Sequence, residues 1–191
     1  MTRRVFPLAL VAIGLMAGVA RSTTVIPPTF DELVSRAQSV FVGEVISQRS
    51  VWQTSAQGRS IKTIVTFRVE DVWKGAASPV TQLEFLGGTI DDLTLEVAGM
   101  PQFRFGQRDV LFVNGEVRTV SPLVGFMHGR MRIERDPATG VDRVRTYDGR
   151  ALVSTAQVGA QRRPSFAPVA PMRLSDLKAA VVGRAAAGRA R

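Results

Sequence analysis

The apolar residues that follow Thr29 change from a helical to an alternating spacing. Over residues 30–37 they recur three and four positions apart, which predicts a short helix. Thr29 and Glu32 stand at capping-box spacing, so the helix should begin there. Residues 40–46 are rich in β-branched side chains and carry apolar groups on both faces, which predicts a central strand.

Two further segments complete the first half of the expected sheet. Residues 48–60 are polar and are interpreted as a loop. A long strand is predicted over residues 61–73, and its alternation of apolar and polar residues changes phase near Glu70. One extra residue in a strand has this effect, so we expect a β-bulge there. Trp73 extends this apolar strand and is expected in the core, and long strands with bulges favour a coiled, barrel-like sheet.

Short strands separated by turns make up the rest of the central region. They are predicted over residues 80–86, 93–97, 109–113, 116–120, 129–135 and 141–147. Asn114 and Gly115 give the strongest hairpin signal, and residues 136–140 supply a second hairpin turn. Because no helix separates these strands, the pattern indicates a mainly β fold with a closed or sandwiched antiparallel sheet.

The predicted β-strands end before residue 154, and a linker and a basic helix follow. Residues 155–173 contain several prolines and are interpreted as a linker. A basic C-terminal helix or tail is predicted over residues 174–191, with Ser175 as its N-cap. Its narrow apolar stripe consists of Leu174, Leu177 and Val181. Beyond Gly183 we expect the helix to fray.

Residues 1–20 have the organisation of a secretory signal peptide. Two arginines precede an apolar run that ends in small residues. The run is shorter than the roughly 20 apolar residues of a membrane span, so we expect cleavage near Ala20 and no transmembrane anchor afterwards. The start also fits a twin-arginine signal, and a plain basic n-region is the simpler interpretation. Residues 21–28 would then form an extended lead-in to a domain over residues 29–154.

The composition narrows the chemistry open to this chain of 191 residues. The absence of Cys excludes a thiol nucleophile, a disulfide and Cys-ligated metal, and a single His excludes a zinc site built on several histidines. Asp91 and Asp92 are interpreted as solvated turn residues, since the acidic spacing of a calcium loop is missing. We expect neither a metal site nor a cofactor.

The net charge of +9 is concentrated at the C-terminal end. Residues 151–191 hold seven basic residues and one acidic residue, whereas residues 21–150 are close to neutral. A DNA-binding domain would carry its basic surface on the folded domain, so nucleic-acid binding is not expected. The tail itself has three interpretations: a solvated end, a weak contact with an anionic surface, or a partner-docking helix.

Three runs give the chain a family resemblance. Residues 39–45 read SVFVGEV, residues 64–75 read IVTFRVEDVWKG, and a strand follows over residues 80–85. This order resembles the opening half of the netrin-like module, which netrins share with the tissue inhibitors of metalloproteinases. Exported bacterial proteins have similar runs, including a Gly-Met-Pro step like that at residues 99–101. The resemblance covers about half of the chain and implies a small OB-like β-barrel with flanking helices.

One departure limits what this resemblance implies. The animal inhibitors use an N-terminal Cys to chelate the metal of their target, and disulfides staple their module. This chain has no Cys, so the resemblance implies the barrel and not that inhibitory mechanism.

His128 is the one candidate general base that titrates near neutral pH. A catalytic interpretation would combine it with Ser121 or Ser154 and with Asp109 or Asp148. No spacing favours one combination, and no Gly-x-Ser-x-Gly elbow is present. A structural histidine at a strand edge is the simpler interpretation.

Trp52, Arg49 and Arg59 are the candidate binding residues, because they lie in the expected polar loop at a position where OB-like barrels often bind ligands. We therefore expect an exported, periplasmic or extracellular, non-enzymatic binding module whose loops contact a protein or cell-envelope partner. The alternatives are a small hydrolase that uses His128 with a carboxylate, and a structural protein attached to the envelope through the basic tail.

Overall fold

A computed structural model describes residues 26–55, 58–115, 120–160 and 170–189. The expected signal peptide, most of the lead-in, residues 116–119 of an expected strand and residues 161–169 of the proline-containing linker lie outside these residues. In chain order the elements are α1 (Phe30–Arg36), β1 (Ser39–Ser55), β2 (Gly58–Lys74), β3 (Val80–Leu86), β4 (Gly88–Ile90), β5 (Leu93–Leu95), β6 (Arg108–Val113), the 3-10 turn η1 (Phe126–Gly129), β7 (Arg130–Arg135), β8 (Asp142–Thr146), the 3-10 turn η2 (Thr155–Gln157) and α2 (Leu174–Arg189).

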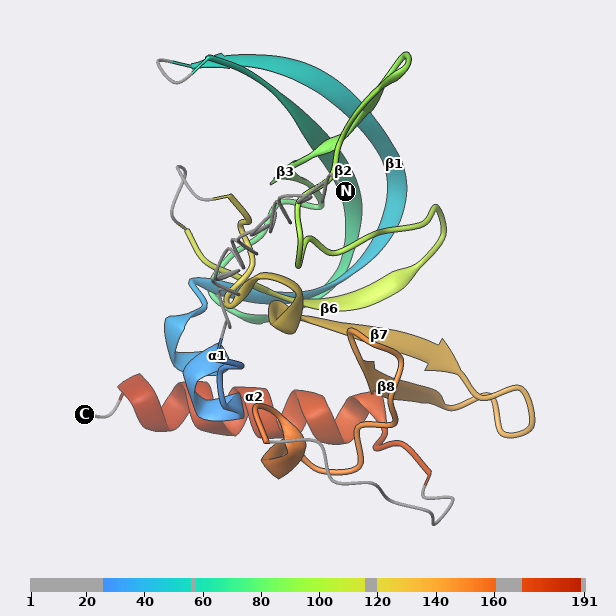
Figure 1. The fold of residues 1–191 in the computed structure, drawn as a ribbon. Coiled ribbons are helices and arrows are strands. Elements are labelled where there is room, and N and C mark those ends of the chain that lie inside the picture. Colours follow the sequence, from blue (N-terminus) through green and yellow to red (C-terminus); the bar gives the residue numbers. More distant parts are fainter. Residues whose placement is uncertain (1–25, 56–57, 116–119, 161–169, 190–191) are drawn as a thin grey trace, which may run out of the picture.

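The fold is mainly β and antiparallel, as the sequence predicts. Six strands form one sheet in the order β3-β2-β1-β6-β7-β8, and β4 and β5 form a separate hairpin. Figure 1 shows that β1 and β2 are long and strongly curved, and that β6, β7 and β8 continue the sheet towards α2. Among the described strands no ladder joins β3 to β8, so the sheet is open rather than a closed barrel.

Helix α1 begins as predicted. The backbone N–H of Thr29 donates to the Glu32 carboxylate at 2.8 Å, and the N–H of Glu32 donates to the Thr29 hydroxyl at 3.3 Å. These two hydrogen bonds complete a capping box. The pKa of the Glu32 carboxyl is lowered by the same backbone and hydroxyl donors of Thr29.

The curvature of the long hairpin has an identifiable cause in its register. Glu70 is left over between the pairs Val42–Asp71 and Gly43–Val69, which confirms the predicted bulge. Two further register shifts were not predicted: one leaves Trp73 unpaired near the end of β2, and the other leaves Ile46 unpaired near the middle of β1. Each bulge increases local twist and bends its strand. Together they coil β1 and β2 over one side of the molecule (Figure 1).

The prediction of a loop over residues 48–60 is wrong. Most of these residues belong to β1 and β2, which stay paired without a register shift from Ser47–Thr66 to Ser55–Gly58. The sequence hides this because both faces of the hairpin's outer half are partly exposed, so the apolar alternation on which strand prediction relies is missing. Backbone pairing alone defines these strand ends.

Two apolar clusters occupy opposite faces of the sheet. The first lies between the sheet and the helices and includes Trp73, Phe112 and Val144 together with Leu33 and Leu177, so Trp73 is in the core as predicted. The second lies on the concave side of the curved strands and consists of Phe41, Val45, Val65, Phe67, Leu83, Phe85, Phe103, Leu111 and Leu123. Strand β1 contributes to both clusters, which confirms its central position.

Irregular segments cover part of the concave side. Phe103 and Leu123 come from the segments before β6 and before β7 and pack into the second cluster. The N–H of Leu86, at the end of β3, donates to the carbonyl of Val120 at 3.0 Å. The predicted hairpin at residues 136–140 is present between β7 and β8. For the hairpin at Asn114 and Gly115, most of the returning strand lies outside the described residues, and β6 pairs with β7.

Helix α2 differs from its prediction in two respects. It begins at Leu174, so Ser175 lies inside the first turn and is not the N-cap. It continues to Arg189 rather than fraying after Gly183, and Ala185 joins the first cluster beside Leu177. Burial of this apolar stripe stabilises the helix, since most helical stability in proteins comes from packing rather than from intrinsic helix propensity. No helix in the described ranges is long and apolar enough to cross a membrane.

Candidate functional site

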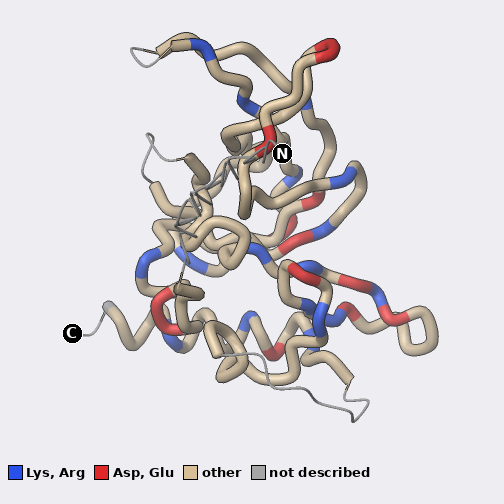
Figure 2. Tube along the Cα trace, viewed as in Figure 1, with Lys and Arg blue, Asp and Glu red and all other residues tan. Residues whose placement is uncertain are grey.

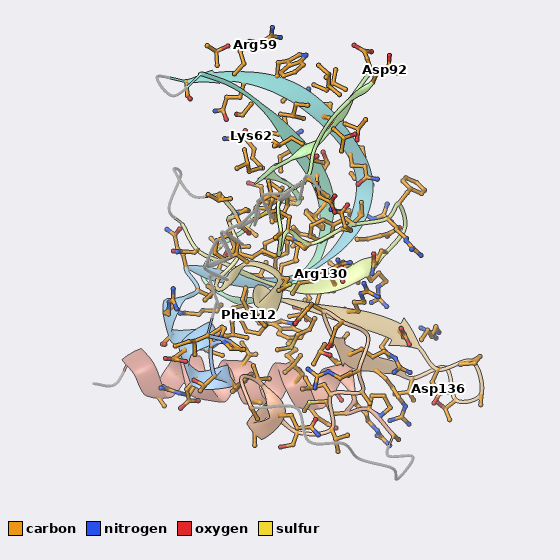
Figure 3. The ribbon with its side chains drawn as sticks, viewed as in Figure 1. Arg59, Lys62, Asp92, Phe112, Arg130 and Asp136 are labelled. Atoms are coloured by element: carbon orange, nitrogen blue, oxygen red, sulfur yellow. The ribbon has the colours of Figure 1, made fainter. Side chains whose placement is uncertain are left out.

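The outer half of the β1–β2 hairpin projects from the body and carries an exposed aromatic side chain on its concave face. Trp52 is 40% exposed and lies opposite buried Ile61 in the register. The guanidinium carbon of Arg59 lies 4.2 Å from the centroid of the Trp52 ring, a cation–π contact that holds the ring in place. Figure 3 shows Arg59 near the outer end of the β1–β2 hairpin.

The structure brings together two of the three predicted binding residues. Trp52 and Arg59 contact each other, but Arg49 is an odd number of positions from Trp52 on the same strand. Successive side chains of a strand point to opposite faces, so Arg49 lies on the convex face. Because these residues lie on paired strands rather than in a loop, their relative positions are fixed by backbone hydrogen bonds.

A cavity of about 270 Å³, which we call the concave cavity, lies further along the same face of the hairpin, and neither Trp52 nor Arg59 lines it. The sheet supplies one wall, the β4–β5 hairpin a second, and the segment that leads from β5 towards β6 a third. Its lining includes Gln48, Val65, Phe85, Glu96, Gln102 and Phe103. Sequence reasoning missed this cavity, because its walls come from segments that only the curvature of β1 and β2 brings together.

Hydroxyl groups and a glycine hold the β4–β5 hairpin against the sheet. The N–H of Thr89 donates to the Ser50 hydroxyl at 3.2 Å, and the Thr63 hydroxyl donates to the carbonyl of Gly87 at 2.7 Å. Gly88 has φ +136°, and a Cβ there would lie 2.4 Å from the Thr63 hydroxyl. Only glycine allows this close approach, which explains why Gly88 begins β4.

A buried ion pair fixes the third wall of the concave cavity. Arg130 and Asp109 are almost fully buried, and Nε of Arg130 donates to the Asp109 carboxylate at 2.9 Å. The same guanidinium donates to the carbonyl of Gln102 and lies 4.3 Å from the centroid of the Phe103 ring. Burial raises the pKa of the Asp109 carboxyl, and the charge and hydrogen bonds of Arg130 oppose that rise. Figure 3 shows Arg130 at the centre of the molecule.

His128 lines a different cavity, of about 400 Å³, which we call the His128 cavity. Its ring makes an edge-to-face contact with Tyr147 at 4.8 Å between centroids. Burial lowers the pKa of the imidazole, and the nearby Asp148 carboxylate opposes this shift. That carboxylate accepts hydrogen bonds from the Thr146 hydroxyl and, at 2.7 Å, from Nε of Arg150.

The expected partners of His128 are only partly brought together. Asp148 is close enough to influence its charge, whereas Asp109 is paired with Arg130. The hydroxyls of Ser121 and Ser154 accept hydrogen bonds from nearby backbone N–H groups, and neither serine lines the His128 cavity. The described residues therefore do not assemble a serine, a carboxylate and His128 into one array.

Charged residues of both signs are interspersed over the described surface (Figure 2). In the basic tail, Lys178 pairs with Asp71 at 2.6 Å and Arg184 pairs with Asp31 at 2.9 Å. The part of the chain that the structure describes contains no group of three or more His, Asp or Glu side chains placed to hold a metal ion. Asp92 lies at the tip of the β4–β5 hairpin (Figure 3).

Comparison with models of known protein families and with curated proteins finds no match to this chain.

Proposed function

We propose that this protein is an exported, non-enzymatic binding module that holds a protein or cell-envelope partner on the concave face of its β1–β2 hairpin. The observation that carries the proposal is the position of an exposed Trp52, stabilised by Arg59, on the face that also lines the concave cavity. Exposed aromatic and arginine side chains on rigid elements are typical anchors of binding surfaces.

The state of the other side chains supports binding rather than catalysis. Gln48, Glu96 and Gln102 line the concave cavity, and their solvent-exposed side chains have no hydrogen-bond or ion-pair partner among the described residues. Groups of this kind can satisfy a ligand without reacting with it. The charged pair behind the cavity, Arg130 and Asp109, is almost fully buried and serves to position the wall.

We further propose that β1, β2, β3, β6 and β7 are an OB-like barrel that is only partly closed, as the netrin-like resemblance implies. Support comes from the strand order, in which β1 pairs with β2 on one side and with β6 on the other, and from the bulges that coil the long strands. The apolar cluster on the concave side would be the interior of this barrel.

The proposed location is the periplasm or the extracellular space. It is supported by the charge and apolar pattern of residues 1–20. Attachment through the basic tail has less support, because Lys178 and Arg184 are paired with carboxylates of the same molecule.

The proposal is tested by co-sedimentation of the purified chain with envelope fragments of its source cells. We expect the double variant Trp52→Ala with Arg59→Ala to bind at least about tenfold more weakly, as for loss of a central anchor. Arg49→Ala is the matched control: it removes a cation from the opposite face of the same hairpin and should bind like the wild type. Circular dichroism verifies that each variant is folded.

Two outcomes would contradict this function. One is equal binding by the Arg49 control and the double variant, which would remove the concave face from the interaction. The other is turnover of a generic ester, peptide or glycoside that disappears in His128→Ala. That result would establish the hydrolase alternative at the His128 cavity.

A further inference from the structure

We propose that the concave cavity binds a neutral sugar residue of an envelope glycan, with Gln48, Gln102 and Glu96 as its hydrogen-bonding groups. This inference rests on the proposed function and names the class of ligand for the same site. It follows from three properties of the cavity: polar side chains without a hydrogen-bond partner among the described residues, a partly apolar lining, and no Lys or Arg among the lining residues.

The free polar groups match the chemistry of sugar hydroxyls. Each glutamine amide offers a donor and an acceptor, and a carboxylate accepts from two neighbouring hydroxyls. Gln48 comes from β1, while Glu96 and Gln102 come from the segment opposite, so they approach a ligand from two walls. Hydrogen bonds from several directions to a small ring are what a polyhydroxylated ligand requires and what an aliphatic side chain of a protein partner would leave unsatisfied.

Part of the cavity lining is apolar and suits the C–H face of a sugar ring. Phe85 and Phe103 belong to the lining but are only 3% and 6% exposed, so the apolar surface open to a ligand comes from the partly buried Leu95, Val97 and Met100. Trp52 is two residues from Ser50 on the same strand face, about 7 Å along β1 from the β4–β5 contact. A second ring of a glycan chain that leaves the cavity in that direction would reach the exposed indole.

Size and charge distinguish this ligand from the other classes considered. The volume of about 270 Å³ is below the range of about 300–1,000 Å³ of sites for drug-sized molecules, so one small ring is the expected occupant. Glu96 is the one charged residue in the lining, and Arg130, which contacts the lining residue Phe103, is paired with the Asp109 carboxylate. An anionic ligand such as a nucleotide would meet no free positive charge there.

The rigidity of the walls favours a weak but specific interaction. Hydroxyl contacts and the close approach of Gly88 fix the β4–β5 hairpin, and Arg130 fixes the carbonyl of Gln102. A cavity that is already formed does not have to order its walls when the ligand enters. The arrangement therefore does not need a conformational change to admit a ring.

The experiment is a titration of the full chain with cellotetraose, maltotetraose, chitotetraose and mannotetraose, followed by NMR amide shifts and calorimetry. We expect at least one of these neutral tetrasaccharides to bind and to shift amides of β1, β5 and residues 96–103. Gln48→Ala and Gln102→Ala should each weaken that binding at least about fivefold. Arg49→Ala, on the convex face beside Gln48, should leave it unchanged.

The inference is overturned if none of the four tetrasaccharides binds, or if the Arg49 control weakens binding as much as the glutamine variants do. The proposed function is judged separately by envelope co-sedimentation. If Trp52 and Arg59 are needed for co-sedimentation while no tetrasaccharide binds, the concave face recognises a protein and only the sugar assignment fails.

Discussion

At the scale of single residues, the pair of Arg130 and Asp109 links the core to the candidate site. Their side chains are 2% and 0% exposed, and they lie 21 positions apart on neighbouring strands. From the sequence alone, Asp109 was a possible partner of His128. Sequence spacing does not show which side chains of two strands lie next to each other in a sheet. In the register of β6 and β7, Asp109 lies opposite Arg132 and Arg130 lies opposite Leu111, so the ion pair joins diagonal neighbours on one face of the sheet.

Arg130→Met should destabilise the protein by about 3–5 kcal/mol, because the buried Asp109 carboxylate loses its hydrogen-bonded counter-charge and keeps only the charge of Arg132 on the facing strand. It should also raise the pKa of Asp109 further, since burial raises that pKa and Arg130 opposes the rise. The folded variant then binds a proton more readily than its unfolded chain. Its deficit relative to the wild type therefore shrinks as the pH falls towards the raised pKa. Urea denaturation between neutral and acid pH measures both effects.

The double variant Arg130→Met with Asp109→Asn is the control for this prediction. It has no buried carboxylate to protonate, so its deficit should not shrink in the same way at acid pH. A single variant within about 1 kcal/mol of the wild type at neutral pH would mean that water or another group neutralises Asp109, and the pair would lose its positioning role.

At the scale of elements, the sequence predicted those features that depend on local chemistry. The capping box at Thr29 and the bulge at Glu70 were found because each is set by residues close together in the chain. The outer halves of β1 and β2 were missed because their pairing, and not an apolar face, makes them strands. Trp52 and Arg59 were identified, but the cavity further along the same face depends on long-range curvature.

Two glycine-to-alanine substitutions, one in β4 and one in α2, should change the stability of the protein in opposite directions. Gly88→Ala should cost about 1–3 kcal/mol, because its φ of +136° and its contact with the Thr63 hydroxyl both disfavour a Cβ. Gly183→Ala, at an exposed position of helix α2, should add about 1 kcal/mol of stability, since alanine is the better helix former and nothing lies within 4 Å of the new methyl group. Thermal and urea denaturation of both variants measure these changes.

The Gly88 variant also tests how the cavity is held. Because its Cβ would displace the β4–β5 hairpin from Ser50 and Thr63, the amides of β4 should exchange with solvent faster than in the wild type. Unchanged exchange and stability would show that the hairpin does not need the close approach. The Gly183 variant serves as the reference, because helix α2 packs on the first apolar cluster, away from the β4–β5 hairpin.

At the scale of the whole molecule, the central strands are buried on both faces, and α2 is part of one of those faces. Leu177 and Val181 are fully buried in the first cluster. A protein truncated before α2 would therefore expose the helix-facing side of the sheet. The basic tail is better examined by single substitutions, which separate its apolar packing from its charges.

Leu177→Ala should lower the free energy of unfolding by about 2–5 kcal/mol, because it leaves a cavity between α2 and the sheet. Lys178→Ala, the next residue, should cost less than about 1 kcal/mol, since its pair with Asp71 is largely exposed and screened by solvent. Urea denaturation of the two variants compares packing with charge at adjacent positions of one helix. If Lys178→Ala were the more damaging of the two, ion pairs rather than apolar burial would hold α2. The tail would then be expected to detach from the body of the protein at high salt, since salt screens exposed ion pairs.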